Sequence, residues 1–314
     1  MGKYILKRLL QMIVVMFLVS FLTYVLIGIM PRDPIYSLYG SDVTPAEYEV
    51  IYHRMGLDKP VIVRYFNWLV NFFKGDLGTS YAYHMPVMEI IGQKIGVTLY
   101  LSIVSTLISF PLGMLFGIIT AVKRGKWQDT TLTLVANISA SIPGFVIAIA
   151  LLFLFCINWK ILPSRGFTFP WENFGDHIRQ IILPMFCLSL GGIAGITRQT
   201  RSSMLEAMRQ DYVRTARSKG LQEKYIISKH VLRNGLIPII TLIGGRLAGM
   251  IGGSVFIENV FSIPGMGTLM VNSVNQIDVP VIQACVLMTS ACMCLAFFIT
   301  DMLYLAVDPR ISLK

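Results

Sequence analysis

Arg246 and Asp301 are ionisable residues that fall inside long apolar stretches of the sequence. Such residues are candidates for function, because a charge in a hydrocarbon environment is costly. An arginine and an aspartate on two helices could form an ion pair that fixes the helices together. Alternatively, Arg246 could line a path through a membrane and bind a substrate carboxylate, to which a guanidinium donates two parallel hydrogen bonds. The sequence leaves both alternatives open.

Glu258 lies at the outer end of the apolar stretch that contains Arg246. A carboxylate at this position suits a gate or a contact to an external protein. A solvated helix end is the simpler interpretation.

Metal and thiol chemistry are not indicated. The five cysteines all lie in apolar stretches and the four histidines all lie outside them. Cys292 and Cys294 are two residues apart, about 200° around a helix, so they cannot both bind one metal ion. An odd number of cysteines in such positions argues against a disulfide framework. We expect no catalytic, cofactor-binding or metal-binding residue in this chain.

A phosphate-binding loop is also absent from the sequence. Gly-Lys occurs only at residues 2–3 and 125–126, where tyrosine or tryptophan follows instead of serine or threonine. If the chain takes part in a process driven by ATP, we expect ATP and magnesium to be bound by another chain.

Residues 198–233 form a basic segment between two apolar stretches, with nine Lys/Arg against three Asp/Glu. Residues 202–220 are predicted to form one amphipathic helix, with Ser203 and Glu206 as a capping box. Its apolar stripe would comprise Met204, Leu205, Met208, Tyr212 and Ala216. Gly220 should end this helix, and a second should span about 222–232. The pattern favours a docking surface, although an amphipathic helix on anionic lipid remains the alternative.

The elements that must position these residues are membrane spans. Apolar residues make up 54% of the 314 and charged residues 14%. Runs long enough to cross about 30 Å of hydrocarbon predict an all-α integral membrane protein. The six predicted spans are Leu9–Met30, Val97–Val122, Thr131–Ile157, Ile181–Thr197, Leu236–Phe256 and Val281–Val307.

The basic residues predict the orientation of the chain. With the N-terminus inside, the basic segment 198–233 also lies inside, which satisfies the positive-inside rule. We therefore expect both termini in the cytoplasm. The same rule accounts for the net charge of +10 without nucleic acid binding.

An outer region of about 65 residues should separate the first two spans. Thr44-Pro-Ala-Glu47 predicts a helix start, and a second helix should run from Pro60 to Lys74. The latter carries Tyr65 and Trp68 on one face, which suits a membrane interface or a partner. Glycines at four-residue spacing recur in the spans and predict close helix packing. They are Gly113, Gly117, Gly191, Gly195, Gly245, Gly249 and Gly253.

Residues 214–220, Arg-Thr-Ala-Arg-Ser-Lys-Gly, resemble the coupling loop of ABC-transporter permeases, whose general pattern is Glu-Ala-Ala, three residues, then Gly. Arg214 and Thr215 replace the first two residues, and Pro238 lies further away than in that pattern. These departures resemble the B-type permease of the dipeptide/oligopeptide/nickel branch. Further matching segments are Met30–Pro34, Gly56–Pro60, Gly75–Ser80, Ser141–Phe145, Leu162–Pro163, Ile257–Gly267 and Asp308–Arg310.

The resemblance implies a type I importer permease fold with six transmembrane helices in a prokaryotic inner or plasma membrane. Its parts would be 1–30 with the first span, an extracytoplasmic region 31–95, a permease core 96–307 with the coupling loop 198–235, and a cytoplasmic tail 308–314. The residues implied in ATPase coupling are Asp211, Arg214, Thr215, Ala216, Arg217, Lys219, Gly220 and Leu221.

The resemblance also implies a function and partners. The chain would form a path for di- or oligopeptides with a second permease, two ATPases and an extracytoplasmic substrate-binding protein. Import of nickel or a metal chelate is the alternative within the family. A channel or ion-coupled carrier would need several acidic or histidine residues in the spans, where the sequence has one aspartate. A scaffold without transport stays open.

Overall fold

The computed structural model describes residues 2–29, 33–40, 42–236, 239 and 242–307. These residues are helical apart from loops, and the β-type pairing among them is a bridge between Thr79 and Pro86. The predicted tail 308–314, with its Asp-Pro-Arg segment, and Pro238 lie outside the described residues.

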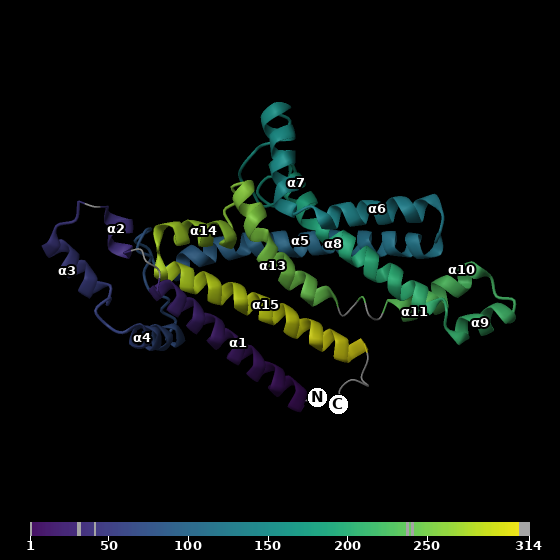
Figure 1. The fold of residues 1–314 in the computed structure, drawn as a ribbon, viewed down its shortest axis with the longest axis horizontal. Coiled ribbons are helices and arrows are strands. Elements are labelled where there is room, and N and C mark those ends of the chain that lie inside the picture. Colours follow the sequence, from purple (N-terminus) through teal and green to yellow (C-terminus); the bar gives the residue numbers. More distant parts are fainter. Residues whose placement is uncertain (1, 30–32, 41, 237–238, 240–241, 308–314) are drawn as a thin grey trace. The chain divides into compact units, whose positions relative to one another are not determined.

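Among the described residues, four helices are long and apolar enough to cross a membrane: α1 (Gly2–Ile29), α5 (Val87–Val122), α8 (Phe174–Ala207) and α15 (Val279–Val307). They correspond to the predicted first, second, fourth and sixth spans (Figure 1). The predicted fifth span, Leu236–Phe256, begins in a stretch that is only partly described and continues as α13 (Leu242–Val260). The count of six spans therefore stays a prediction.

The third predicted span is not one continuous helix. Residues 131–157 fall in α6 (Trp127–Ser141), α7 (Gly144–Leu151) and the π-helical segment η1 (Leu152–Asn158), with a bend of 94° between α6 and the α7–η1 piece. Pro143 causes the break, because proline excludes the helical conformation from the residue before it. Ile142 is accordingly extended, with ψ 124°.

The described chain forms two compact units, of which the first comprises Met1–Leu99 and Pro264–Cys294. Its outer helices are α2 (Pro34–Tyr39), α3 (Pro45–Arg54) and α4 (Val61–Phe73). Thr44 and Glu47 form the predicted capping box of α3, which confirms that helix start. The predicted second helix is α4, which ends at Phe73 with Lys74 as its C-cap, and Gly75 follows with a positive φ.

The aromatic face of α4 packs on α1 within this unit. Tyr65 is fully buried, lies against Phe21 and Tyr24, and shares a 2.9 Å hydrogen bond with Ser20. These aromatic contacts bury large apolar surface and satisfy the phenol hydroxyl. The face that sequence reasoning assigned to a membrane interface or a partner therefore has its partner in the same chain.

The rest of the first unit is built on α14 (Met266–Gln276), α15 and the start of α5, which share an apolar core around Val87, Ile91 and Val281. Asp278 precedes α15 and is fully buried. It accepts hydrogen bonds from the Ser80 hydroxyl and from the backbone N–H groups of Tyr81 and Ala82. A buried carboxylate with several donors fixes this loop to α15.

The second unit, Tyr100–Ile263 and Leu295–Lys314, contains the elements that carry the candidate site. Within it α6 and α13 lie against α8. The predicted close packing of glycines is confirmed at Gly113 and Gly117 of α5, because a Cβ at Gly113 would come within 2.6 Å of the Ile196 Cβ and one at Gly117 would overlap Thr200. The absence of side chains at these two positions brings α5 against α8.

Candidate functional site

A compact group of short helices follows α8, and we call residues 208–235 the loop module (Figure 1). Its elements are α9 (Asp211–Ser218), α10 (Glu223–Tyr225), the π-helical segment η2 (Ile226–Val231) and α11 (Leu232–Gly235). The second predicted helix, 222–232, matches these last three elements. The prediction of a single helix over residues 202–220 is wrong, because a turn at residues 208–210 separates α8 from α9.

The turn changes which side chains face inward. Val213 and Ala216 of α9 are buried against Met204 of α8, and Ile226 and Val231 complete this core. Tyr212, which the predicted stripe placed inside, is 38% exposed instead. Ser203 cannot cap a helix start, because it is buried in the last two turns of α8. The module thus has its own apolar core and packs on the end of α8.

Gly220 ends α9 as predicted, in a Schellman motif. Its φ is +74°, its N–H donates to the carbonyl of Arg217 at 2.9 Å, and the Leu221 N–H donates to the carbonyl of Ala216 at 3.4 Å. This pair of bonds satisfies carbonyls that the helix end would leave free, and it requires a left-handed residue that glycine adopts without strain. A Cβ at Gly220 would meet nothing within 4 Å, so the constraint there is conformational rather than steric.

The turn at Gly220 is closed by an ion pair. The Arg217 guanidinium donates two hydrogen bonds to the Glu223 carboxylate, at 3.0 and 2.6 Å. These hydrogen bonds hold the pKa of Glu223 below its ordinary value. Both side chains are about half exposed, so the pair sets the geometry of the turn more than its stability.

Most of the residues implied in coupling lie on one exposed surface of the module. Ala216 is buried in its core, and the others are exposed: Asp211, Arg214, Thr215, Arg217, Lys219, Gly220 and Leu221. The exposed residues Tyr212 and Tyr225 add aromatic surface to the same helices. A basic surface with exposed apolar and aromatic side chains has the composition of a protein-binding site rather than of a solvated loop.

An ion pair that sequence reasoning missed ties α6 to α8 just before the module. Arg201 donates hydrogen bonds to both oxygens of Asp129, each at 2.9 Å. Asp129 also accepts from the Gly125 N–H and from Thr133, and its side chain is 9% exposed. The partners are 72 residues apart, so no local spacing signals the pair.

Arg246 of α13 and Arg198 of α8 line one cavity of about 640 Å³. The cavity also reaches the break between α6 and α7, and its remaining lining is apolar or small, without an aspartate or glutamate among the described residues. Neither arginine forms a hydrogen bond or ion pair with another described residue. The sequence predicts Arg246 as a candidate site residue, whereas Arg198 is there only the first residue of the basic segment 198–233.

The alternative pairing of Arg246 with Asp301 is not formed in the structure. Both side chains are described and partly buried, and Arg246 forms no ion pair with Asp301 or another described residue. Glu258 is fully buried and accepts a 3.0 Å hydrogen bond from Ser254, so the interpretation of a solvated helix end is wrong. Its part in a gate or a partner contact stays a prediction.

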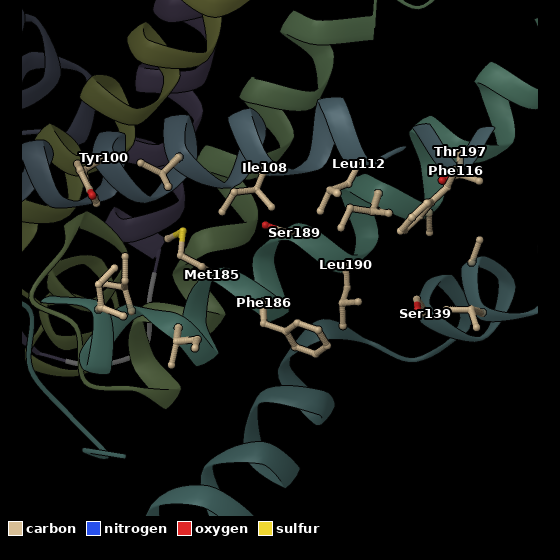
Figure 2. Close-up of a pocket in the computed structure, with 18 of the residues that line it drawn as sticks. Tyr100, Ile108, Leu112, Phe116, Ser139, Met185, Phe186, Ser189, Leu190 and Thr197 are labelled. Carbon is tan, nitrogen blue, oxygen red and sulfur yellow. The ribbon is translucent and has the colours of Figure 1, made fainter. Parts of the chain in front are cut away.

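A second cavity, of about 700 Å³, lies between α5, α6 and α8 and is apolar. Figure 2 shows Ile108 and Leu112 of α5 pointing toward the same hollow as Phe186 and Leu190 of α8. Its lining holds no lysine, arginine, aspartate or glutamate, and its polar residues Tyr100 and His177 are hydrogen-bonded to each other. The cavity with the two arginines is the better candidate for a substrate path.

The sequence matches described protein families over nearly its whole length. Residues 113–313 match the family described as binding-protein-dependent transport system inner membrane component, and residues 1–102 match the N-terminal region of such membrane components.

Individual proteins give the same result. The oligopeptide transport system permease protein AppB of Bacillus subtilis is 37% identical over 99% of this chain and 100% of its own length. The dipeptide transport system permease protein DppB of Lactococcus lactis is 37% identical over the full length of both. An inward-facing structure of the MetNI methionine ABC transporter matches 70% of this chain and 97% of its own chain, with 19% identity and a TM-score of 0.57, and shares the fold.

Proposed function

Because the chain belongs to the family of binding-protein-dependent transport system inner membrane components, we propose that it is the permease subunit of an ATP-driven peptide importer. The loop module carries this proposal, since it combines an apolar core that it shares with the end of α8, a hydrogen-bonded turn at Gly220 and an exposed basic surface. The chain lies in the inner membrane and is not itself a catalyst. Its helices form part of the membrane path.

The other subunits of the importer are separate chains. A second, homologous permease completes the path, two ATPase subunits bind ATP and magnesium, and an extracytoplasmic protein delivers the substrate. Both termini and the loop module face the cytoplasm, as the distribution of lysine and arginine indicates. The surface that receives the ATPase is the one that carries Thr215, Lys219 and Leu221.

The geometry of α8 supports a mechanism for coupling. This helix is continuous from Phe174 to Ala207, about 50 Å at 1.5 Å per residue. Its last turns form the core of the loop module, and its middle, with Gly191, Gly192 and Arg198, lines the charged cavity. When ATP binding draws the ATPases together, the module moves with them and α8 transmits the displacement to the cavity wall.

Peptides are the substrate that the relatives support, since AppB and DppB are named for oligopeptide and dipeptide transport. Nickel is the alternative within the branch. The described residues hold no group of three histidine, cysteine or acidic side chains that could bind a metal ion. The choice between peptide classes rests with the delivering protein.

Uptake by reconstituted complexes tests the proposal. In proteoliposomes that contain this chain, its partner permease and both ATPases, a peptide-loaded binding protein should drive uptake of labelled peptide that requires ATP. Omitting the ATPases should abolish uptake. Full transport by this polypeptide alone would refute the assignment. Faster uptake of nickel than of peptide would show that nickel, and not peptide, is the substrate.

A further inference from the structure

The charged cavity carries two cations and no counter-charge of its own. Arg246 and Arg198 both line it, and its described lining contains no acidic side chain. A partly buried charge without a partner is unfavourable, and a cleft lined by one sign of charge attracts the opposite sign. The cavity is therefore suited to an anionic group.

The Arg246 side chain packs against a glycine of α8. A Cβ at Gly195 of α8 would overlap the guanidinium of Arg246, so this side chain lies directly against the α8 backbone. Its orientation is therefore restricted by packing, which leaves the guanidinium ready to donate paired hydrogen bonds. Gly195 belongs to the four-residue glycine pattern, but its missing side chain makes room for an arginine side chain and not for the backbone of another helix.

Other glycines keep the cavity open. A Cβ at Gly191, Gly249 or Gly253 would meet nothing within 4 Å, although all three line the cavity. They therefore do not bring helices of this chain together, unlike Gly113 and Gly117. The cavity volume of about 640 Å³ lies within the range of roughly 300–1,000 Å³ that small-molecule sites occupy.

We propose that Arg246, assisted by Arg198, binds the C-terminal carboxylate of the peptide as it passes through this cavity. The inference rests on the proposed function and adds the group that the permease itself recognises. Every peptide with a free C-terminus carries this carboxylate, so the site serves substrates of different sequence. The interaction is weak enough for release because Arg198 is exposed and Arg246 only partly buried.

The test compares Ala-Ala-Ala with its C-terminal amide in the reconstituted complex. The affinity of the binding protein for each peptide is measured first, and transport is then measured with the binding protein saturated by each. The wild-type complex should import the free acid about tenfold faster than the amide, the effect expected for a charge-assisted hydrogen bond. Arg246→Gln should remove this preference by slowing the acid and not the amide.

Two further variants keep the test decisive if Arg246→Gln does not assemble. Arg246→Lys keeps the charge but not the paired donors, and Arg198→Gln leaves Arg246 in place; each should reduce the acid preference in part. Arg179→Gln is the matched control, because Arg179 is an exposed arginine on α8 outside the cavity. It should leave the preference unchanged.

Equal import of acid and amide by the wild type would overturn the inference while peptide transport stands. Equal slowing of both peptides in Arg246→Gln would also overturn it, because it would show that the role of Arg246 does not depend on the carboxylate. Failure of the wild type to import either peptide from a loaded binding protein would instead overturn the proposed function.

Discussion

At the scale of single residues, the conformation of Gly220 explains why glycine suits the end of α9. Its φ of +74° serves the Schellman motif that ends α9, and the space around it is open. Gly220→Ala should therefore strain the turn by about 1–2 kcal/mol without a clash. We expect fewer peptides imported per ATP hydrolysed by the reconstituted complex.

A control variant distinguishes the effect of backbone strain in general from the effect of strain at Gly220. Gly125 also has an open environment and a positive φ of 78°, but it lies in the turn between α5 and α6. Gly125→Ala should leave the transport-to-hydrolysis ratio near the wild-type value, and Gly220→Asn should lower it less than alanine because asparagine tolerates this conformation. Indistinguishable ratios for the two alanine variants would show that the Gly220 turn has no special part in coupling.

At the scale of elements, the seam between α5 and α8 depends on Gly113 and Gly117. Gly113→Ala places a Cβ within 2.6 Å of Ile196, so α5 and α8 must separate. Overpacking of this kind costs about 1–3 kcal/mol. We expect a lower midpoint of thermal unfolding for the purified complex in detergent.

Gly191→Ala offers the matched comparison, because Gly191 belongs to the same sequence pattern but a Cβ there has open space. It should leave the unfolding midpoint close to that of the wild type. A midpoint as low as that of Gly113→Ala would mean that another chain packs at Gly191, and an unchanged midpoint in Gly113→Ala would contradict the tight seam.

The same elements show how far the sequence determines the structure. Thr44 and Gly220 act through local backbone chemistry, so the helix start at Thr44 and the helix end at Gly220 could be predicted. The break at Pro143 also has a local cause, but it interrupts a span that was predicted as continuous. The turn at residues 208–210 could not, because the apolar spacing of Met204, Met208 and Tyr212 fits one helix. It forms because Val213 and Ala216 then reach the core of the loop module.

The candidate site shows the same limit. Arg246 was recognisable because its charge lies in an apolar stretch. Its approach to Arg198 and Gly195, and the pairing of Arg201 with Asp129, depend on contacts between helices distant in sequence. Hydrophobic periodicity identifies the face of a helix that is buried, and not the neighbour that buries it.

At the scale of the whole molecule, the proposed function requires other chains. Part of the chain is a membrane path with a cavity that two arginines line, without an acidic side chain among its described lining, and part is a basic module. The sequence contains no phosphate-binding loop motif. The central claim is that this module is held by a nucleotide-hydrolysing subunit.

Photo-crosslinking from the module measures this contact most directly. A benzophenone amino acid replaces Thr215 or Lys219, both exposed, and Lys59 in the outer region serves as the control position. In membranes that contain the whole transporter, the account predicts cross-links from Thr215 and Lys219 to the ATPase subunit and none from Lys59. Cross-links from the module to lipid alone would contradict it.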